Sequence, residues 1–209
     1  QAYLNAMDSG PEDVYVVTLS AMLSGSHNSA QTARTMLEEN EPAKNVHVFN
    51  TRSASSGETL VALKIRELAQ AGIPFGEVVQ KTEQFIGRMR TLFTLESLDI
   101  LRKNGRLGRL QGEAAAALRI KLFLHATPEG EIGLLGKALS IKQALGMMIS
   151  HIGADADHAG KTLVISHCNC QERASWLKSQ IERLCAFAQI VIVETRGIAT
   201  VYADNGGIV

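Results

Sequence analysis

Short apolar runs alternate with segments of helical periodicity along this chain. Residues 14–19 form an apolar run rich in β-branched side chains, which is typical of a buried strand. By residue 31 the pattern has become helical, and a second apolar run follows at residues 46–49. Two further helical patterns cover residues 58–72 and about 74–89. The face of the first helix that we expect to be buried carries Ala30, Ala33, Met36 and Leu37.

The pattern changes near Arg90. Beyond it the periodicity predicts a short strand, a helix, an alanine-rich helix, a hairpin, and then helices alternating with two strands. The short strand is expected at residues 91–94, the helix at 95–101, the alanine-rich helix at 111–118 and the hairpin at 121–139. The later helices are expected from residue 140 onward and at 172–184, and the two strands at 163–166 and 190–193. The inward face of the helix at 172–184 is expected to carry Ala174, Leu177, Ile181 and Leu184. Residues 197–207 predict a sharp turn before a final apolar run.

Strands that alternate with helices indicate an α/β fold with a parallel sheet covered on both faces. Because the alternation breaks near residue 90, we expect a first α/β domain at residues 1–90 and a second at 91–209. In parallel sheets, ligands sit at the carboxyl ends of the strands, where the first two strand–helix loops would lie. The chain opens without Met and ends inside an apolar run, so we expect an N-terminally truncated piece of a longer protein.

The composition excludes some classes of protein. The chain has 45% hydrophobic and 20% charged residues, as an ordinary globular protein does. Lysine plus arginine equals aspartate plus glutamate, at 21 each, and aromatic residues are few, so nucleic-acid binding is not expected. No apolar run approaches the roughly 20 residues that cross a bilayer. Three cysteines, an odd number, fit a reduced compartment, and we expect a cytoplasmic protein.

The most distinctive chemistry lies in the link between the first strand and the first helix, which carries Ser24, Gly25 and Ser26. A helix start presents unpaired N–H groups and the positive end of the helix dipole, and hydroxyls can add hydrogen bonds. Such a loop can bind a carboxylate or a phosphate. The same serines also fit a plain helix N-cap. The loop lacks the patterns of a nucleophile elbow, a dinucleotide-binding loop and a P-loop.

Three groups of residues resemble the DegV family of bacterial lipid-binding proteins, in which some members are the fatty-acid-binding subunits of a fatty acid kinase. The stretch TLSAMLSGSHNSAQTA is similar to the family's LSS-x-LSGTY-x-SA segment. Residues 51–57, TRSASSG, are similar to its D-[ST]-x-x-x-S-x-G turn, with Asn50 in place of aspartate. The third group consists of Phe93, Leu98, Leu101, Gly105, Arg106, Ile120 and Lys121. The resemblance implies a two-domain α/β fold, in which a parallel αβα sheet domain is followed by a mixed-sheet α/β domain.

The resemblance also implies a ligand and its site. A long-chain fatty acid would lie between the two domains, with its carboxylate held by Ser24 and by the backbone of Gly25 and Ser26. The histidine that binds the head group in many members falls on Ala203 here, and Asn205 is expected to substitute for it. Asn-Gly-Gly at this place is also an ordinary tight turn. The sequence does not name the lining of the acyl chain; residues of the second domain, including the helix at 114–118, are candidates for it.

The partners that the resemblance implies are a long-chain fatty acid, the catalytic subunit of a fatty acid kinase and, transiently, a membrane. Leu139 stands where the kinase-linked members carry an arginine that helps the partner dock. We expect a binding protein and not an enzyme, without a cofactor. We also expect no metal, because Cys168 and Cys170 lack the wider spacing of structural zinc sites.

Two other functions stay open on the sequence. A small-molecule hydrolase could use Ser24 as its nucleophile with His27 or His47 as the base, although the nucleophile elbow is missing. A regulatory α/β module with a degenerate pocket would account for Ala203 and Leu139. Turnover of acyl esters would favour the hydrolase, and a space filled by side chains would favour the regulatory module.

Overall fold

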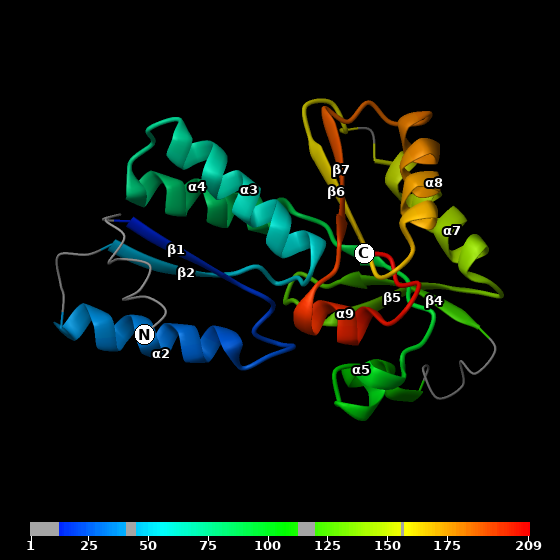
Figure 1. Cartoon of the computed structure of the whole chain (residues 1–209), viewed down its shortest axis with the longest axis horizontal. Coiled ribbons are helices and arrows are strands. Elements are labelled where there is room, and N and C mark those ends of the chain that lie inside the picture. Colours follow the sequence, from blue (N-terminus) through cyan, green and yellow to red (C-terminus); the bar gives the residue numbers. More distant parts are fainter. Residues whose placement is uncertain (1–12, 41–44, 113–119, 156) are drawn as a thin grey trace. The chain divides into compact units, whose positions relative to one another are not determined.

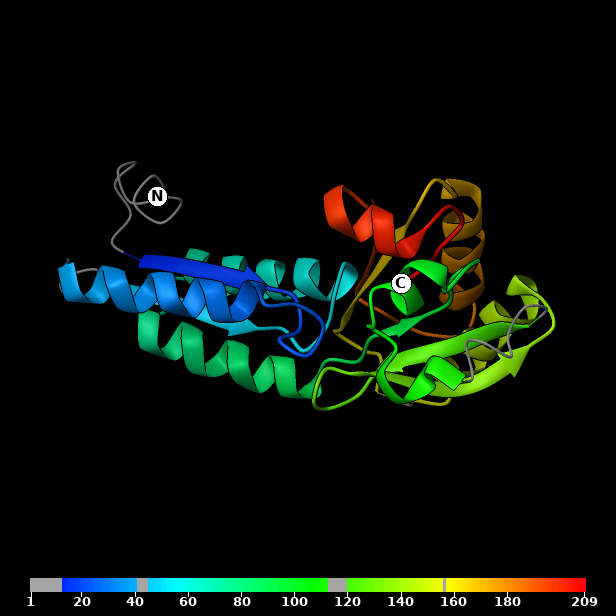
Figure 2. The same ribbon diagram turned by 90° about the horizontal axis from the view of Figure 1, so that it is seen from below.

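The computed structural model describes residues 13–40, 45–112, 120–155 and 157–209. The chain forms two compact units. The first extends to Met89 and includes Pro128–Gly130, and the second comprises Arg90–Thr127 and Glu131–Val209. Figures 1 and 2 show the elements of each unit from two directions.

The first unit is built on two parallel strands, β1 (Asp13–Thr18) and β2 (Asn45–Asn50). Helix α2 (Ser26–Asn40) lies on one face of this pair, and helices α3 (Ser56–Gln70) and α4 (Phe75–Arg88) lie on the other (Figure 1). Alternate β1 side chains therefore enter two apolar clusters. Val14 and Val16 pack with Leu37 of α2, and Tyr15 and Val17 pack with the α3 and α4 side chains. The predicted sheet with helices on both faces is confirmed.

The connection between α3 and α4 follows from its glycine and proline. Gly72 adopts a φ of 72°, a conformation that glycine reaches without steric cost, directly after the end of α3. Pro74 precedes the first residue of α4, where its fixed φ and its missing N–H do not disturb the helix. Both helix boundaries were predicted from these two residues.

The second unit contains antiparallel and parallel strands. Strands β3 (Leu92–Phe93), β4 (Lys121–Ala126) and β5 (Ile132–Ala138) form an antiparallel sheet in that order. Strands β6 (Thr162–His167) and β7 (Gln189–Glu194) pair in parallel. Bridges from Ile208 to Thr94 and His167 join the two sheets. The helices are α5 (Asp99–Lys103), a 3₁₀ turn (Gly108–Leu110), α7 (Ile141–Gly153), α8 (Gln171–Glu182) and α9 (Gly197–Ala203).

One cluster of apolar side chains holds most of the second unit together. Helix α7 begins after Ser140, whose side chain accepts a hydrogen bond from Gln143 N at 3.2 Å, as an N-cap does. The helix then packs on Phe123 of β4 and, with α8, on Ile165 of β6. Ala174, Leu177 and Ile181 of α8 are buried there as predicted.

Three predictions about these elements are wrong. Met36 is 62% exposed, because the side of α2 that packs on the sheet carries the neighbouring Leu37, which is buried there. Leu184 is 63% exposed, because α8 ends at Glu182 before Leu184 could join its inward face. Residues 197–203 form helix α9 and not a turn, and Ala203, the last residue of this helix, is buried. The predicted alanine-rich helix lies, beyond Gly112, outside the described residues.

No helix in the described ranges is both long and apolar enough to cross a membrane.

Candidate functional site

The loop between β1 and α2 places Ser24 just before a long helix. Ser24 Oγ accepts a hydrogen bond from Ser26 N at 3.2 Å, and Ser24 N donates to Ser20 O at 3.1 Å. The serine is half-buried, whereas Gly25 and Ser26 are exposed. Among the residues that the structure describes, the Ser24 hydroxyl has no acceptor for its own proton. It therefore caps the helix and can still donate to a ligand.

The first backbone N–H groups of α2 add further donors. Ser26 N and Ser29 N donate to Ser24 Oγ and to Gly25 O. Within the described part of the chain, His27 N and Asn28 N have no acceptor, as is usual in the first turn of a helix. The helix has 15 residues, so its dipole also favours an anion at this end. The predicted group of Ser24, Gly25 and Ser26 thus lies together at an anion-favouring helix start.

His27 has a defined tautomer. Thr18 Oγ1 donates its proton to Phe49 O at 2.9 Å, so it can only accept from the His27 ring. His27 Nδ1 lies 3.1 Å from Thr18 Oγ1 and therefore carries a hydrogen. His27 consequently fixes the start of α2 to the end of β1.

The β2–α3 loop is tied to the first loop by backbone and side-chain hydrogen bonds. Ser20 N donates to Ser53 O at 2.7 Å, and Thr51 N donates to Thr18 O at 3.2 Å. Asn50 Oδ1 accepts from Ala21 N at 3.2 Å and from Arg52 N at 3.1 Å. Each loop therefore holds the other at the carboxyl ends of the parallel strands.

The backbone of the second loop has an unusual conformation. Arg52 and Ser55 have φ values of 51° and 57°, in the left-handed region that non-glycine residues rarely adopt. The Asn50 and Ser53 contacts hold this conformation in place. Such backbone is concentrated at ligand-binding loops in proteins generally.

Glu58 caps the start of α3. Ser55 N donates to Glu58 Oε2 at 2.9 Å, as in a capping box. Burial raises the pKa of the Glu58 carboxyl, and the Ser55 N–H offsets only part of this rise.

Replacing Glu58 with glutamine is expected to flatten the pH dependence of stability. Because the folded-state pKa of Glu58 is raised, the native state holds a proton that the unfolded state releases. This contribution is complete at low pH and is lost as the pH rises through the raised pKa. Glutamine keeps the acceptor for Ser55 N and cannot ionise. Thermal unfolding from about pH 4 to about pH 8 should show a variant increasingly more stable than the parent. Parallel curves would contradict this.

Asn205 lies in the second unit, in the loop that follows α9. It is exposed, and its N–H donates to Asp204 Oδ1 at 2.7 Å. Asp204 has a φ of 54° and Gly206 a φ of 88°, so the loop is a tight turn. Ala203 is only 5% exposed and packs in an apolar cluster with Leu95. The role of Asn205 as a substitute for a histidine at Ala203 stays a prediction.

An ion cluster holds this loop. Glu96 pairs with Lys121 Nζ and with Arg173 Nη2, each at 2.8 Å, and Arg173 Nη1 also donates to Gly206 O. Burial alone would raise the pKa of Glu96, but the two cations lower it below its usual range. The glycine-rich turn is therefore anchored to β4 and α8.

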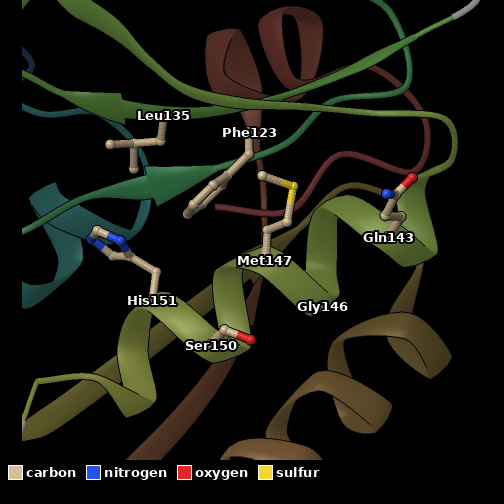
Figure 3. Close-up of a pocket in the computed structure, with 7 residues that line it drawn as sticks. All are labelled: Phe123, Leu135, Gln143, Gly146, Met147, Ser150 and His151. Carbon is tan, nitrogen blue, oxygen red and sulfur yellow. The ribbon is translucent and has the colours of Figure 1, made fainter.

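The second unit also contains a pocket, which Figure 3 shows between the β4–β5 hairpin and α7. Its volume is about 720 Å³. It is lined by Phe123, Leu135, Gln143, Gly146, Met147, Ser150 and His151. The rings of His151 and Phe123 pack edge to face, with their centroids 5.7 Å apart. None of the predicted carboxylate-binding residues is in its lining, and the expected helix at 114–118 lies outside the described residues.

The geometry does not assemble the hydrolase considered above. His27 Nδ1 bonds to Thr18, and His47 Nε2 lies 3.3 Å from Glu83 Oε1. In the described ranges neither ring contacts Ser24 Oγ, so no base is placed to activate it. The described residues include no group of three or more His, Cys, Asp or Glu side chains that could hold a metal ion. All three cysteines are free thiols.

Two residues of this region were not predicted to contribute to it. Asn50 stands out in the sequence only as a departure from the family's aspartate, and Thr18 lies within the predicted strand at 14–19. A polar residue at the end of each parallel strand was the available signal, because such residues meet at one sheet edge. Ser20, in the β1–α2 loop, is also buried, and its hydroxyl donates to Gly130 O at 2.7 Å.

Comparison with known proteins adds independent evidence. A model of the DegV family, described as uncharacterised, matches residues 1–208. A DegV domain-containing protein of Streptococcus gordonii is 35% identical over 210 residues, which cover 99% of this chain and 73% of that protein.

Two solved structures are similar over the same extent. A DegV family protein from Ruminococcus gnavus, described with vaccenic acid, has a TM-score of 0.92 and 46% identity, covering 99% of this chain and 74% of that one. The fatty acid kinase (Fak) B3 protein of Streptococcus pneumoniae, loaded with linoleic acid, has a TM-score of 0.88 and 32% identity, covering 99% and 73%.

Proposed function

We propose, since this chain belongs to the DegV family, that it binds a long-chain fatty acid and holds the carboxylate at Ser24, Gly25 and Ser26. The two similar structures named above support the ligand class, because one is described with vaccenic acid and the other with linoleic acid. The path of the acyl chain between two domains stays a prediction.

One observation carries the assignment of the carboxylate site. One lone pair of the Ser24 hydroxyl is engaged by Ser26 N, and the hydroxyl retains a proton to donate. Beside it lie the N–H groups of His27 and Asn28, which have no acceptor among the described residues. Three donors at the positive end of one helix suit a carboxylate, which accepts through two oxygens. A neutral head group would gain less from the positive end of the helix dipole than a carboxylate does.

The apolar tail supplies most of the binding free energy in this proposal. Burial of a methylene group contributes about 0.8 kcal/mol, so a tail of about sixteen carbons contributes on the order of 10 kcal/mol before ordering costs. The polar contacts then fix the orientation of the ligand and distinguish an acid from a neutral lipid.

The chain acts in this proposal as a carrier, in which the Ser24 hydroxyl donates a hydrogen bond to the carboxylate. The similarity to the Fak B3 protein supports a second step, in which the bound acid is presented to a fatty acid kinase. The three free thiols agree with the proposed cytoplasmic location.

Replacing Ser24 with alanine is expected to weaken palmitate binding several-fold, because the hydroxyl donor is lost. Isothermal titration of the delipidated chain with palmitate measures this, and binding by the parent tests the proposed function itself. Ser29→Ala is the matched control, since Ser29 lies exposed on the same helix turn. Equal affinity of Ser24→Ala and the parent would remove Ser24 from the site. A parent that binds neither palmitate nor oleate would contradict the proposed function.

A further inference from the structure

The turn between β4 and β5 is closed by its own hydrogen bonds. Thr127 N donates to Glu131 O at 2.8 Å, and Glu131 N donates to Thr127 Oγ1 at 3.2 Å. Gly130 completes the turn with a φ of 90°, as the glycine of a three-residue hairpin loop does. By their contacts Pro128–Gly130 belong to the first unit, where Gly130 is buried. The turn thus adds a preformed piece of backbone to that unit.

Gly130 lies directly against both loops at the carboxyl ends of β1 and β2. Its carbonyl oxygen accepts a hydrogen bond from the Ser20 hydroxyl, in the β1–α2 loop, at 2.7 Å. A Cβ atom at Gly130 would overlap Ser20 Oγ and would lie 2.9 Å from Arg52 Cα, in the β2–α3 loop. Because only a hydrogen atom fits in this space, any larger residue would have to displace one of the loops.

Ser20 links this contact to the residue that we propose binds the carboxylate. Ser20 is completely buried, and its Oγ accepts from Met22 N at 3.2 Å while it donates to Gly130 O. Its carbonyl oxygen accepts from Leu23 N and Ser24 N at 3.0 Å and 3.1 Å. Ser20 therefore holds three consecutive N–H groups, of which the last is that of Ser24. Without the Gly130 acceptor, the buried hydroxyl would have to turn or to remain unsatisfied.

From these contacts we infer that Gly130 is a positioning residue for the carboxylate site, because the turn holds the Ser24 loop in its binding conformation before the ligand arrives. This inference rests on the proposed function. A loop that is already ordered loses little conformational freedom on binding, so its contacts contribute more fully to the affinity. Releasing the turn should therefore weaken fatty-acid binding although Ser24 itself is unchanged.

The test compares Gly130→Ala with the parent, by palmitate titration and by hydrogen exchange of the Leu23 and Ser24 amides. We expect Gly130→Ala to weaken palmitate binding about tenfold and to speed the exchange of both amides, because the added methyl group displaces Ser20. Gly72→Ala is the matched control, since Gly72 has a φ of 72° in the same unit and a Cβ there meets nothing within 4 Å. It strains the backbone in the same way beyond the far end of α3, so palmitate binding should stay as in the parent.

A second variant separates positioning from a general loss of stability. Ser20→Ala removes the hydroxyl through which the turn acts and leaves Gly130 in place. Because both changes break the same contact, the double variant should bind palmitate no more weakly than Gly130→Ala alone. Additive losses of affinity would overturn the inference, since the two residues would then act independently.

The outcomes separate this inference from the proposed function. If Gly130→Ala binds palmitate as the parent does, the inference is overturned while fatty-acid binding stands. Equal weakening by Gly72→Ala would reduce the effect to backbone strain and overturn it too. If the parent binds no palmitate, the proposed function fails and the inference fails with it. Should Gly130→Ala not fold, Ser20→Ala alone decides, since it must weaken palmitate binding and speed exchange at Leu23 and Ser24.

Discussion

Replacing Gly57 with alanine is expected to destabilise the first unit and to abolish tight fatty-acid binding. A Cβ atom at this buried position would overlap the Ser53 hydroxyl and lie 2.6 Å from Ser53 Cβ. Ser53 is itself buried, so it cannot swing away without moving the loop. Overpacking of this kind costs about 1–3 kcal/mol, or a fall in Tm on the order of 5 °C for a chain of this size. Because Ser53 O holds Ser20 N, the Ser24 loop should shift as well.

Thermal unfolding and palmitate titration of the same sample check both parts of this prediction. Gly87→Ala is the matched control, since Gly87 is exposed on α4 and a Cβ there meets nothing within 4 Å. Alanine should keep or raise the stability of that helix, by about 0.5–1 kcal/mol. If Gly57→Ala melts and binds as the parent does, the close packing of the two loops has no role in the site.

Replacing Leu124 with alanine is expected to have the largest effect on stability in the second unit. Leu124 is fully buried in β4, the central strand of the antiparallel sheet. Removing a buried leucine side chain costs about 2–5 kcal/mol, because apolar contacts are lost and a cavity remains. The Tm should fall by on the order of 5–15 °C.

Hydrogen exchange should localise this loss to β3, β4 and β5. Leu135→Ala on β5 is the control, because Leu135 is 37% exposed and its truncation leaves no closed cavity. Similar losses of Tm in the two variants would contradict the assignment of Leu124 to the core.

The strands of both units were predictable because they are short apolar runs. Each run at 14–19, 46–49, 163–166 and 190–193 lies within or next to an observed strand, β1, β2, β6 or β7. Burial between helices selects β-branched and aliphatic residues there, and this pattern needs no knowledge of the partner strand.

The errors occur where tertiary contacts decide the structure. Residues 197–203 include three β-branched residues and a glycine, which have low helix propensity, yet they form α9. Burial of Ala203 against Leu95 and Cys168 stabilises this helix, and these contacts lie far away in the sequence. Met36 fits the helical period about as well as Leu37, and only the position of the sheet decides which of them is buried.

The candidate site was predictable in part. Small polar residues between a strand and a helix indicated an anion site at Ser24, although the helix begins at Ser26, earlier than the apolar period suggested. The two hydrogen bonds by which Asn50 Oδ1 links the loops could not be predicted in this way, because they depend on the register that pairs Thr18 with Asn50. That register brings the two loops together, so that the Asn50 side-chain amide accepts a hydrogen bond from the backbone of each loop.

The central claim is that this chain binds a long-chain fatty acid. Native mass spectrometry of the chain purified from bacteria tests it most directly. The account predicts a species heavier than the protein by one long-chain fatty acid, which is released on denaturation and replaced when palmitate is added after delipidation. A bare protein mass that neither palmitate nor oleate changes would contradict the account.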